Sequence, residues 1–131
     1  MSSIFTAIIK GEIPCYKVAE DEHYFAFLDI NPVQIGHTLV IPKKEVDVLF
    51  EMDDETYNGL FSFSKRVAAA IKKSFDCNRV GMSVVGLEVP HAHIHLMPIS
   101  SLDDMNFFKA KKVLSKEELS SIAHQIAENF I

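Results

Sequence analysis

Three histidines stand at every second position late in the chain, in the segment His91-Ala92-His93-Ile94-His95. In a β-strand, alternate side chains share one face, whereas a helix would spread the three rings around its circumference. Pro90 and Pro98 flank the segment, and they disfavour a helix because proline lacks a backbone N–H and restricts the residue before it. The spacing therefore predicts a strand at residues 91–97 with a row of imidazoles on one face and the alternate residues in the interior.

The composition is that of one compact domain. The chain has 131 residues, of which 48% are hydrophobic, so it can bury a core of its own. Its formal charge of −5 does not suit a protein that binds nucleic acid or an anionic membrane surface. No apolar run approaches the roughly 18 residues of a membrane span, and the first residues lack a signal-peptide pattern. We therefore expect a single domain over residues 1–131 in the cytoplasm, with no nucleic-acid or membrane partner.

Hydrophobic periodicity predicts an α+β fold. A short helix begins after Ser2 or Ser3 and ends before Gly11. The other elements expected in chain order are strands at 16–20, 24–29 and 37–42, a long helix at 53–75, strands at 80–85 and 91–97, and a closing helix at about 115–130. This order of strands and helices favours a five-stranded, largely antiparallel sheet.

The chemistry of the histidine row has three possible explanations: metal ligation, catalysis and structural hydrogen bonding. Three histidines on one face could ligate zinc. A neutral imidazole is also a good nucleophile toward phosphorus when its other ring nitrogen is fixed as a hydrogen-bond donor. Neighbouring histidines can then donate to phosphate oxygens or protonate a leaving group. The middle residue, His93, is the candidate nucleophile.

Four segments closely resemble the signatures of one family. They are SIFTAIIKGEIP at residues 3–14, FLDINP at 27–32, GHTLVIPKK at 36–44 and GLEVPHAHIHLMP at 86–98. In this order they resemble the histidine triad (HIT) superfamily of nucleotide hydrolases and transferases. The likeness covers residues 3–98 and is nearest to the histidine triad nucleotide-binding (phosphoramidase) branch of bacterial type.

The resemblance implies a HIT-like fold and a reaction at the α-phosphate of purine nucleoside phosphoramidates or related nucleotides. His93 would attack the phosphorus and form a covalent nucleotidyl-histidine intermediate. His91 and His95 would orient it and contact the phosphate or leaving group, while His37 would support them from the neighbouring strand. No cofactor is implied.

The resemblance also implies the nucleotide-binding residues. Asp29 would hold the ribose hydroxyls, and backbone N–H groups around Glu88 and Val89 would bind the phosphate. The apolar slot for the base would be formed by Ile4, Phe5, Ile8, Phe27 and Ile30.

Several of these residues have a plain structural alternative. His37 beside a glycine is often a hydrogen-bonded core histidine, and Asp29 before Asn-Pro is often a turn residue. Phe5 and Phe27 could belong to the core alone. These alternatives remain open from the sequence.

The chain departs from the family pattern at several positions. Many bacterial relatives bind a structural zinc where this chain has Ser3, Thr6 and Glu45, so we expect no metal site. Val85 replaces an asparagine of many relatives, and Glu88 stands where some have a serine that can donate to phosphate. Both changes bear on the choice of leaving group.

His95 indicates hydrolysis, because transferase relatives carry glutamine at that position. The alternatives are a dinucleoside polyphosphate hydrolase that uses the same nucleophile, a non-catalytic nucleotide-binding or regulatory protein, and a metal-binding protein. The resemblance further implies a homodimer paired through the helix at 53–75 and one strand edge. The physiological substrate is not predicted.

Overall fold

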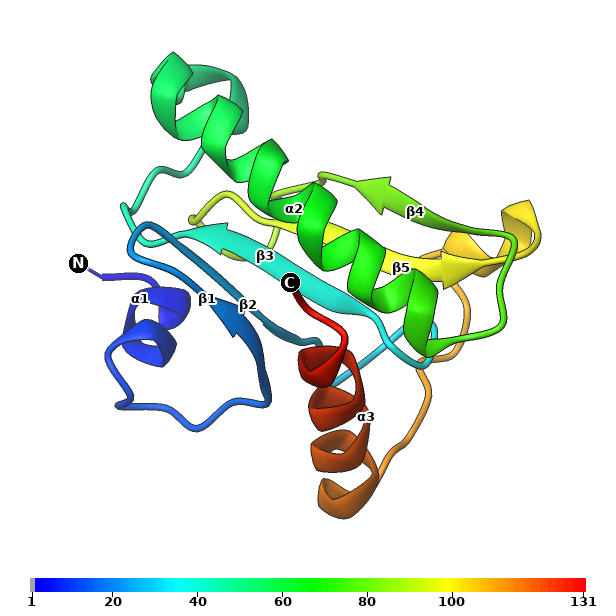
Figure 1. The fold of residues 1–131 in the computed structure, drawn as a ribbon. Helices are drawn as coiled ribbons and strands as arrows, with labels where there is room; N and C mark the ends of the chain where they lie inside the picture. Colours follow the sequence, from blue (N-terminus) through cyan, green and yellow to red (C-terminus); the bar gives the residue numbers. More distant parts are fainter. Residues whose placement is uncertain (1) are drawn as a thin grey trace.

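The computed structural model describes residues 2–131 and contains one five-stranded antiparallel sheet (Figure 1). The strand order across the sheet is β1-β2-β3-β5-β4, and every neighbouring pair is antiparallel. The strands are β1 (Lys17–Glu20), β2 (Tyr24–Leu28), β3 (Thr38–Pro42), β4 (Arg79–Ser83) and β5 (Ile94–Ile99). The predicted α+β class and antiparallel sheet are confirmed.

Three α-helices pack on this sheet. They are α1 (Ile4–Ile9), α2 (Asp54–Ser74) and α3 (Lys116–Glu128), with 3-10 turns at Leu49–Glu51 and Leu102–Met105. Figure 1 shows α2 crossing one face of the sheet, with α3 beside it. No helix within residues 2–131 combines the length and apolar character needed to cross a membrane.

Side chains of β2 alternate between two hydrophobic clusters, one on each face of the sheet. Tyr24, Ala26 and Leu28 belong to the main core under α2 and α3, while Phe25 and Phe27 belong to a smaller cluster beneath α1. All five residues of β2 are buried. The period-two alternation of a strand therefore places α1 on the opposite face from α2.

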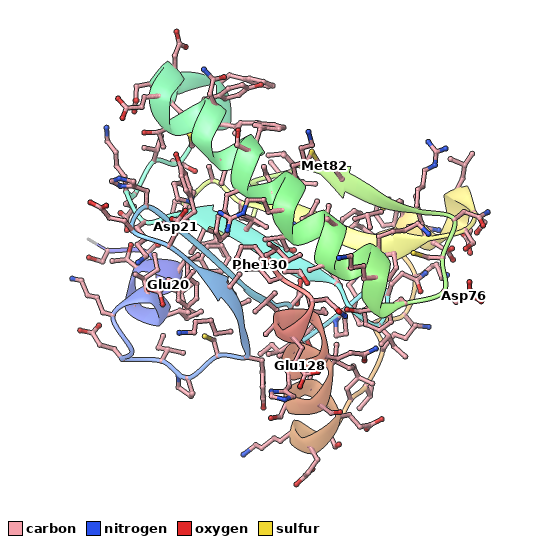
Figure 2. All side chains as sticks on the ribbon, viewed as in Figure 1. Glu20, Asp21, Asp76, Met82, Glu128 and Phe130 are labelled. Carbon is pink, nitrogen blue, oxygen red and sulfur yellow. The ribbon has the colours of Figure 1, made fainter. Side chains whose placement is uncertain are left out.

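The closing helix is fixed to the main core by its last residues. Figure 2 shows Phe130 beside α2, where its ring centroid lies 5.6 Å from that of Phe63. The guanidinium carbon of Arg66 lies 4.6 Å from the Phe130 ring centroid. Between β5 and α3, the chain runs past one end of the sheet (Figure 1).

A side chain caps the start of each of the three helices, and the cap of α1 is one of the two serines expected from the sequence. Ser3 caps α1, Asp53 caps α2, and Ser115 forms a capping box with Glu118 at the start of α3. Each cap accepts a hydrogen bond from a backbone N–H of the first turn, a group that otherwise lacks a partner there.

The last strand begins later than predicted. β5 starts at Ile94, so of the three histidines only His95 lies within it. The backbone before it bonds to loops instead, because Ala92 N donates to the Val46 carbonyl at 2.7 Å and His91 N to the Val89 carbonyl at 2.8 Å. The histidine row therefore crosses from a loop into a strand.

Gly36 determines how the chain enters β3 and hence where His37 lies. Its φ is +94°, in the region that favours glycine. A Cβ at this position would also come within 2.6 Å of the Phe75 ring. Any other residue here would disturb the approach of His37 to the sheet.

Candidate active site around the histidine row

A cavity of about 450 Å³ opens beside two of the three histidines. Its wall comes from the end of β2, the loop before β3, the loop between β4 and β5, the start of β5, and the segment after the second 3-10 turn. The lining residues are Asp29, Asn31, Val33, His37, Val85, Gly86, Leu87, Glu88, His93, His95, Phe107, Phe108 and Lys111. The cavity thus joins five of the site residues predicted from the sequence, which lie up to 66 positions apart on the chain: Asp29, His37, Glu88, His93 and His95.

His93 is held in one tautomer by the backbone. Its Nδ1 lies 2.8 Å from the carbonyl oxygen of His91. A carbonyl can only accept, so Nδ1 carries the proton and the lone pair of the neutral ring is on Nε2. His93 is 6% exposed, and the Phe5 ring lies edge-on to it with centroids 5.0 Å apart. This is the state in which an imidazole can act as a nucleophile.

A chain of hydrogen bonds also fixes the tautomers of His37 and His95. The backbone N–H of Val33 donates to His37 Nδ1 at 3.0 Å, so the proton of the neutral His37 ring is on Nε2. That proton is donated to His95 Nδ1 at 2.9 Å, which leaves His95 with a proton on Nε2. His95 is therefore a hydrogen-bond donor in a wall of the cavity.

Burial keeps both of these imidazoles neutral. Desolvation is the largest cause in each case, and it lowers the pKa of His37 to about 3 and that of His95 to about 4. The two rings, with centroids 5.2 Å apart, consequently act as oriented neutral donors and acceptors at neutral pH.

Asp29 has one carboxylate oxygen committed to local structure and one near His37. Oδ1 accepts from the backbone N–H of Asn31 at 2.8 Å, as in the turn that the sequence suggested. Oδ2 lies 3.7 Å from His37 Nε2. Burial raises the pKa of Asp29. The turn role and a ligand-binding role are compatible, because the side chain lines the cavity.

Asp29, His37 and His95 each offer a ligand atom within 4.8 Å of the others, but their hydrogen bonds do not suit a cation. Because His37 Nδ1 accepts from Val33, its Nε2 holds the ring proton, and a metal at that atom would require its removal. The cluster is better described as a hydrogen-bonded relay.

His91 lies behind His93, away from the cavity. Its Nε2 donates to the carbonyl of Pro42 at 2.8 Å and its Nδ1 accepts from the Ser3 hydroxyl at 2.7 Å. Burial lowers its pKa, and its side chain is fully buried. The structure does not bring His91 to the cavity wall, where a phosphate contact would form.

The residues of the expected base slot are unevenly exposed, and one of them, Phe5, lies beside His93. Phe5 and Phe27 are buried with ring centroids 5.4 Å apart, and Ile8 and Val89 pack against the same cluster. Ile4 and Ile30 are 52% and 61% exposed. Among the eight expected nucleotide-binding residues, only Asp29 and Glu88 line the cavity.

Sequence reasoning missed the wall formed by residues 107–111. The Phe107 ring lies edge-on to His95 with centroids 5.0 Å apart, and Lys111 Nζ donates to the Phe107 carbonyl. The backbone N–H of Lys112 donates to the Pro32 carbonyl at 2.9 Å, which ties this segment to the loop before β3. Two adjacent phenylalanines in a stretch without helical or strand periodicity were the available signal for a functional wall.

Comparison with known proteins agrees with this α+β fold. A profile of the HIT domain matches residues 10–102. This chain therefore belongs to the HIT domain family. An uncharacterized HIT-like protein of Methanocaldococcus jannaschii is 44% identical over 126 residues, covering 91% of this chain and 97% of that protein.

Two further relatives connect the family to an activity and to a solved fold. An adenosine 5′-monophosphoramidase of Schizosaccharomyces pombe is 38% identical over 99 residues, covering 75% of this chain and 74% of that enzyme. The crystal structure of a Hit-like protein from Bartonella henselae superposes with a TM-score of 0.85 at 30% identity, covering 98% of this chain and 96% of that one. The predicted HIT-like fold is confirmed.

The matched segment leaves out two parts of the histidine environment. α1 precedes it, and residues 107–111 follow it. Both parts nevertheless touch histidine rings, through Phe5 on one side and Phe107 on the other. These flanking contacts are properties of this chain beyond the segment that the profile describes.

Proposed function

We propose that this protein is a nucleotide hydrolase or transferase that acts on the α-phosphate of purine nucleoside phosphoramidates through a nucleotidyl-His93 intermediate. The observation that carries the proposal is the hydrogen bond from His93 Nδ1 to the His91 carbonyl, since it leaves a lone pair on Nε2 of a histidine that lines a cavity. The monophosphoramidase relative supports the choice of substrate class.

The reaction would proceed in two displacements. In the first, His93 Nε2 forms a bond to the α-phosphorus while the bond from phosphorus to the leaving nitrogen breaks, and the leaving amine takes up a proton. The attacking ring gains positive charge, which strengthens its Nδ1–H bond to the His91 carbonyl. In the second, water attacks the phosphorus, the bond to His93 breaks, and the water gives up a proton. His95 Nε2–H is the donor suited to a phosphoryl oxygen.

The binding roles follow from the same site. Asp29 would accept hydrogen bonds from the ribose hydroxyls, and the N–H groups near Glu88 and Val89 would contact the phosphate. The base would lie on the apolar surface around Phe5 and Phe27, with Ile4, Ile8 and Ile30 at its border. No metal ion or cofactor enters this scheme, so we expect activity to survive a chelator.

A second candidate function is hydrolysis of a dinucleoside polyphosphate by the same nucleophile. One observation favours it: Lys111 is the only cationic side chain among the cavity-lining residues of the described chain, residues 2–131. A cation at the wall suits a substrate with more phosphate charge than a phosphoramidate carries. If the purified protein binds nucleotides but turns over neither substrate, a non-catalytic role replaces both enzymatic ones.

We also propose that the protein is a cytoplasmic homodimer. In the sheet of residues 2–131, β4 pairs with β5 on one side and has no neighbour on the other. Met82, labelled on this strand in Figure 2, is 44% exposed. An unpaired strand edge readily accepts a second copy. Sedimentation at micromolar concentration tests this, and a monomer at all concentrations contradicts it.

The deciding experiment offers adenosine 5′-phosphoramidate and a diadenosine polyphosphate to the same preparation and compares kcat/KM. Rapid quench followed by mass spectrometry of peptides should find one nucleotidyl group on His93. Turnover of the phosphoramidate with His93 modified supports the proposal. Turnover without modification of His93, or none with either substrate, contradicts it.

A further inference from the structure

The side chains of Ser3 and His91, 88 positions apart in the chain, meet in the interior. The Ser3 hydroxyl lies 2.7 Å from His91 Nδ1, and both residues are buried. His91 Nε2 lies 2.8 Å from the Pro42 carbonyl, which can only accept. The neutral ring therefore has its proton on Nε2, and Ser3 must donate its hydroxyl proton to Nδ1. Both nitrogens of His91 are thus held by this chain.

Ser3 is itself oriented by its neighbours. Its backbone N–H donates to Glu45 Oε1 at 2.7 Å, and its Oγ accepts from the backbone N–H of Thr6 at 3.1 Å. The Thr6 hydroxyl donates to the same Glu45 oxygen. These bonds from Ser3 and Thr6 lower the pKa of Glu45 and keep it an acceptor. Thr6 Oγ1 is a second possible acceptor for the Ser3 hydroxyl at 3.3 Å, but His91 Nδ1 is the nearer one at 2.7 Å, so the Ser3 proton goes to His91.

The next hydrogen bond in this series connects His91 to the candidate nucleophile, His93. His91 uses its carbonyl oxygen to accept from His93 Nδ1 at 2.8 Å. A shift of the His91 ring would move this carbonyl and with it the His93 imidazole. We propose that Ser3 is a positioning residue for His93, acting through the clamped ring and the carbonyl of His91. Glu45 and Thr6 hold Ser3 in the orientation that this requires.

The role is distinct from helix capping. Ser3 caps α1 and Ser115 caps α3, and each accepts from a backbone N–H at about the same distance, 3.1 Å and 3.0 Å. Only the Ser3 hydroxyl also reaches a histidine within the described residues 2–131. Ser115→Ala is therefore a matched control, because it removes the same group from a helix cap remote from the cavity.

The kinetic test rests on the proposed function and compares Ser3→Ala, Ser3→Thr and Ser115→Ala with the wild type. Loss of one hydrogen bond of ordinary strength predicts that Ser3→Ala lowers kcat about three- to tenfold with KM unchanged. Ser3→Thr restores the hydroxyl and should keep kcat near the wild-type value. Ser115→Ala should lower thermal stability without changing kcat.

Three results would overturn the proposal: a folded Ser3→Ala protein with wild-type kcat, equal losses of kcat in Ser3→Ala and Ser115→Ala, or a Ser3→Thr protein as slow as Ser3→Ala. Each of these would mean that Ser3 serves only the cap or the packing of α1.

A spectroscopic test does not depend on turnover, and its measurement on the wild type does not depend on the folding of a variant. Nitrogen-15 NMR of the wild-type histidines at pH 7.5 should show His91 protonated on Nε2 and His93 protonated on Nδ1. In Ser3→Ala the His93 signals should move toward a mixture of tautomers. His91 protonated on Nδ1 in the wild type would refute the proposal. If His93 is never modified by a nucleotide but these tautomers are found, the proposed function fails and the positioning network stands.

Discussion

The two ends of the histidine row are surrounded differently. At one end, His91 has both ring nitrogens bonded to groups of this chain, Ser3 and Pro42, and its ring lies outside the cavity. At the other end, His95 has one nitrogen bonded to His37, and its ring lines the cavity. Histidines at a regular spacing thus have different surroundings, because their hydrogen-bond partners differ.

Between them, His93 shares one property with each neighbour. Like His91, it has a ring nitrogen bonded to a backbone carbonyl, and like His95, it lines the cavity. We therefore expect the buried end to hold the row rigid and the open end to contact a ligand. If this division is correct, substitutions at the open end should affect the reaction, and those at the buried end should affect geometry and stability.

Replacement of the middle histidine should have the largest effect. His93→Ala removes the nucleophile, and we expect kcat to fall by about 10⁴-fold or more, while nucleotide binding changes little. Steady-state kinetics and a titration with AMP measure the two quantities. His124→Ala is the control, since His124 is exposed on α3 and pairs with Glu128. A His93→Ala protein with more than a tenth of wild-type activity would exclude His93 as the nucleophile.

Replacement of His95 tests the open end. His95→Ala removes an oriented donor from the cavity wall and should lower kcat about 10²-fold. The reason is that its Nε2–H would stabilise charge that grows on the phosphoryl group in the transition state. Thermal unfolding should show only a modest loss, because His95 contributes one of the bonds to His37. The division between the two ends is wrong if the loss of stability in this variant accounts for the loss of kcat.

The ribose-binding role proposed for Asp29 predicts that the protein prefers ribonucleotides to 2′-deoxyribonucleotides. In Asp29→Asn, one acceptor becomes a donor, so kcat/KM for a ribonucleotide substrate should fall about tenfold, chiefly through KM. The 2′-deoxy analogue should be affected less, because it lacks one of the two ribose hydroxyls from which Asp29 would accept. Comparison of the two substrates with both proteins gives the result. Equal losses with both substrates would show that Asp29 acts through His37 instead.

Local signals were sufficient to predict much of the fold. Ser115 followed three positions later by Glu118 is a capping-box pattern, and it forms that box at the start of the predicted closing helix. The apolar stripe of α2 identifies a helix of 21 residues. Such signals arise from neighbours three or four positions apart, so a sequence displays them directly. The start of β5 was misplaced because the period-two pattern continues through residues that bond to Val46 and Val89 instead of to a strand.

The site could be predicted only where one residue carries the chemistry. The spacing pointed to His93, but nothing near His37 revealed that Val33 donates to it and thereby sets its tautomer. Because Ser3 and Glu45 stand where many bacterial relatives have zinc ligands, we expected no metal site there. The hydrogen-bonded network that these residues form could not be predicted, because it joins segments that meet only in the folded chain. Contacts such as those of Phe107 with His95 join segments with no shared periodicity, and single-sequence patterns do not encode them.

A different kind of effect concerns stability at acid pH, and it tests whether the open end of the row stays neutral. In the folded protein the pKa of His37 is lowered to about 3 by burial, below the value near 6.5 of an unfolded chain. The unfolded state therefore binds more protons between these values, and the stability present above about pH 6.5 is lost as the pH falls toward about 3. Asp29 acts in the opposite direction, since its pKa is raised by burial, and partly offsets the loss.

His37→Asn removes the group whose pKa is lowered to about 3, so the melting temperature of this variant should fall less steeply with acid than that of the wild type. Each pH unit over which His37 stays neutral contributes about 1.4 kcal/mol, or about 4 °C for a domain of this size. Differential scanning calorimetry of both proteins from pH 7 to pH 4.5 measures the two slopes. The remaining ionisable groups are present in both proteins, so the difference between the two slopes of melting temperature against pH reports on His37. Parallel slopes would mean that His37 takes up a proton without unfolding, and the open end would then carry a charge that the neutral relay excludes.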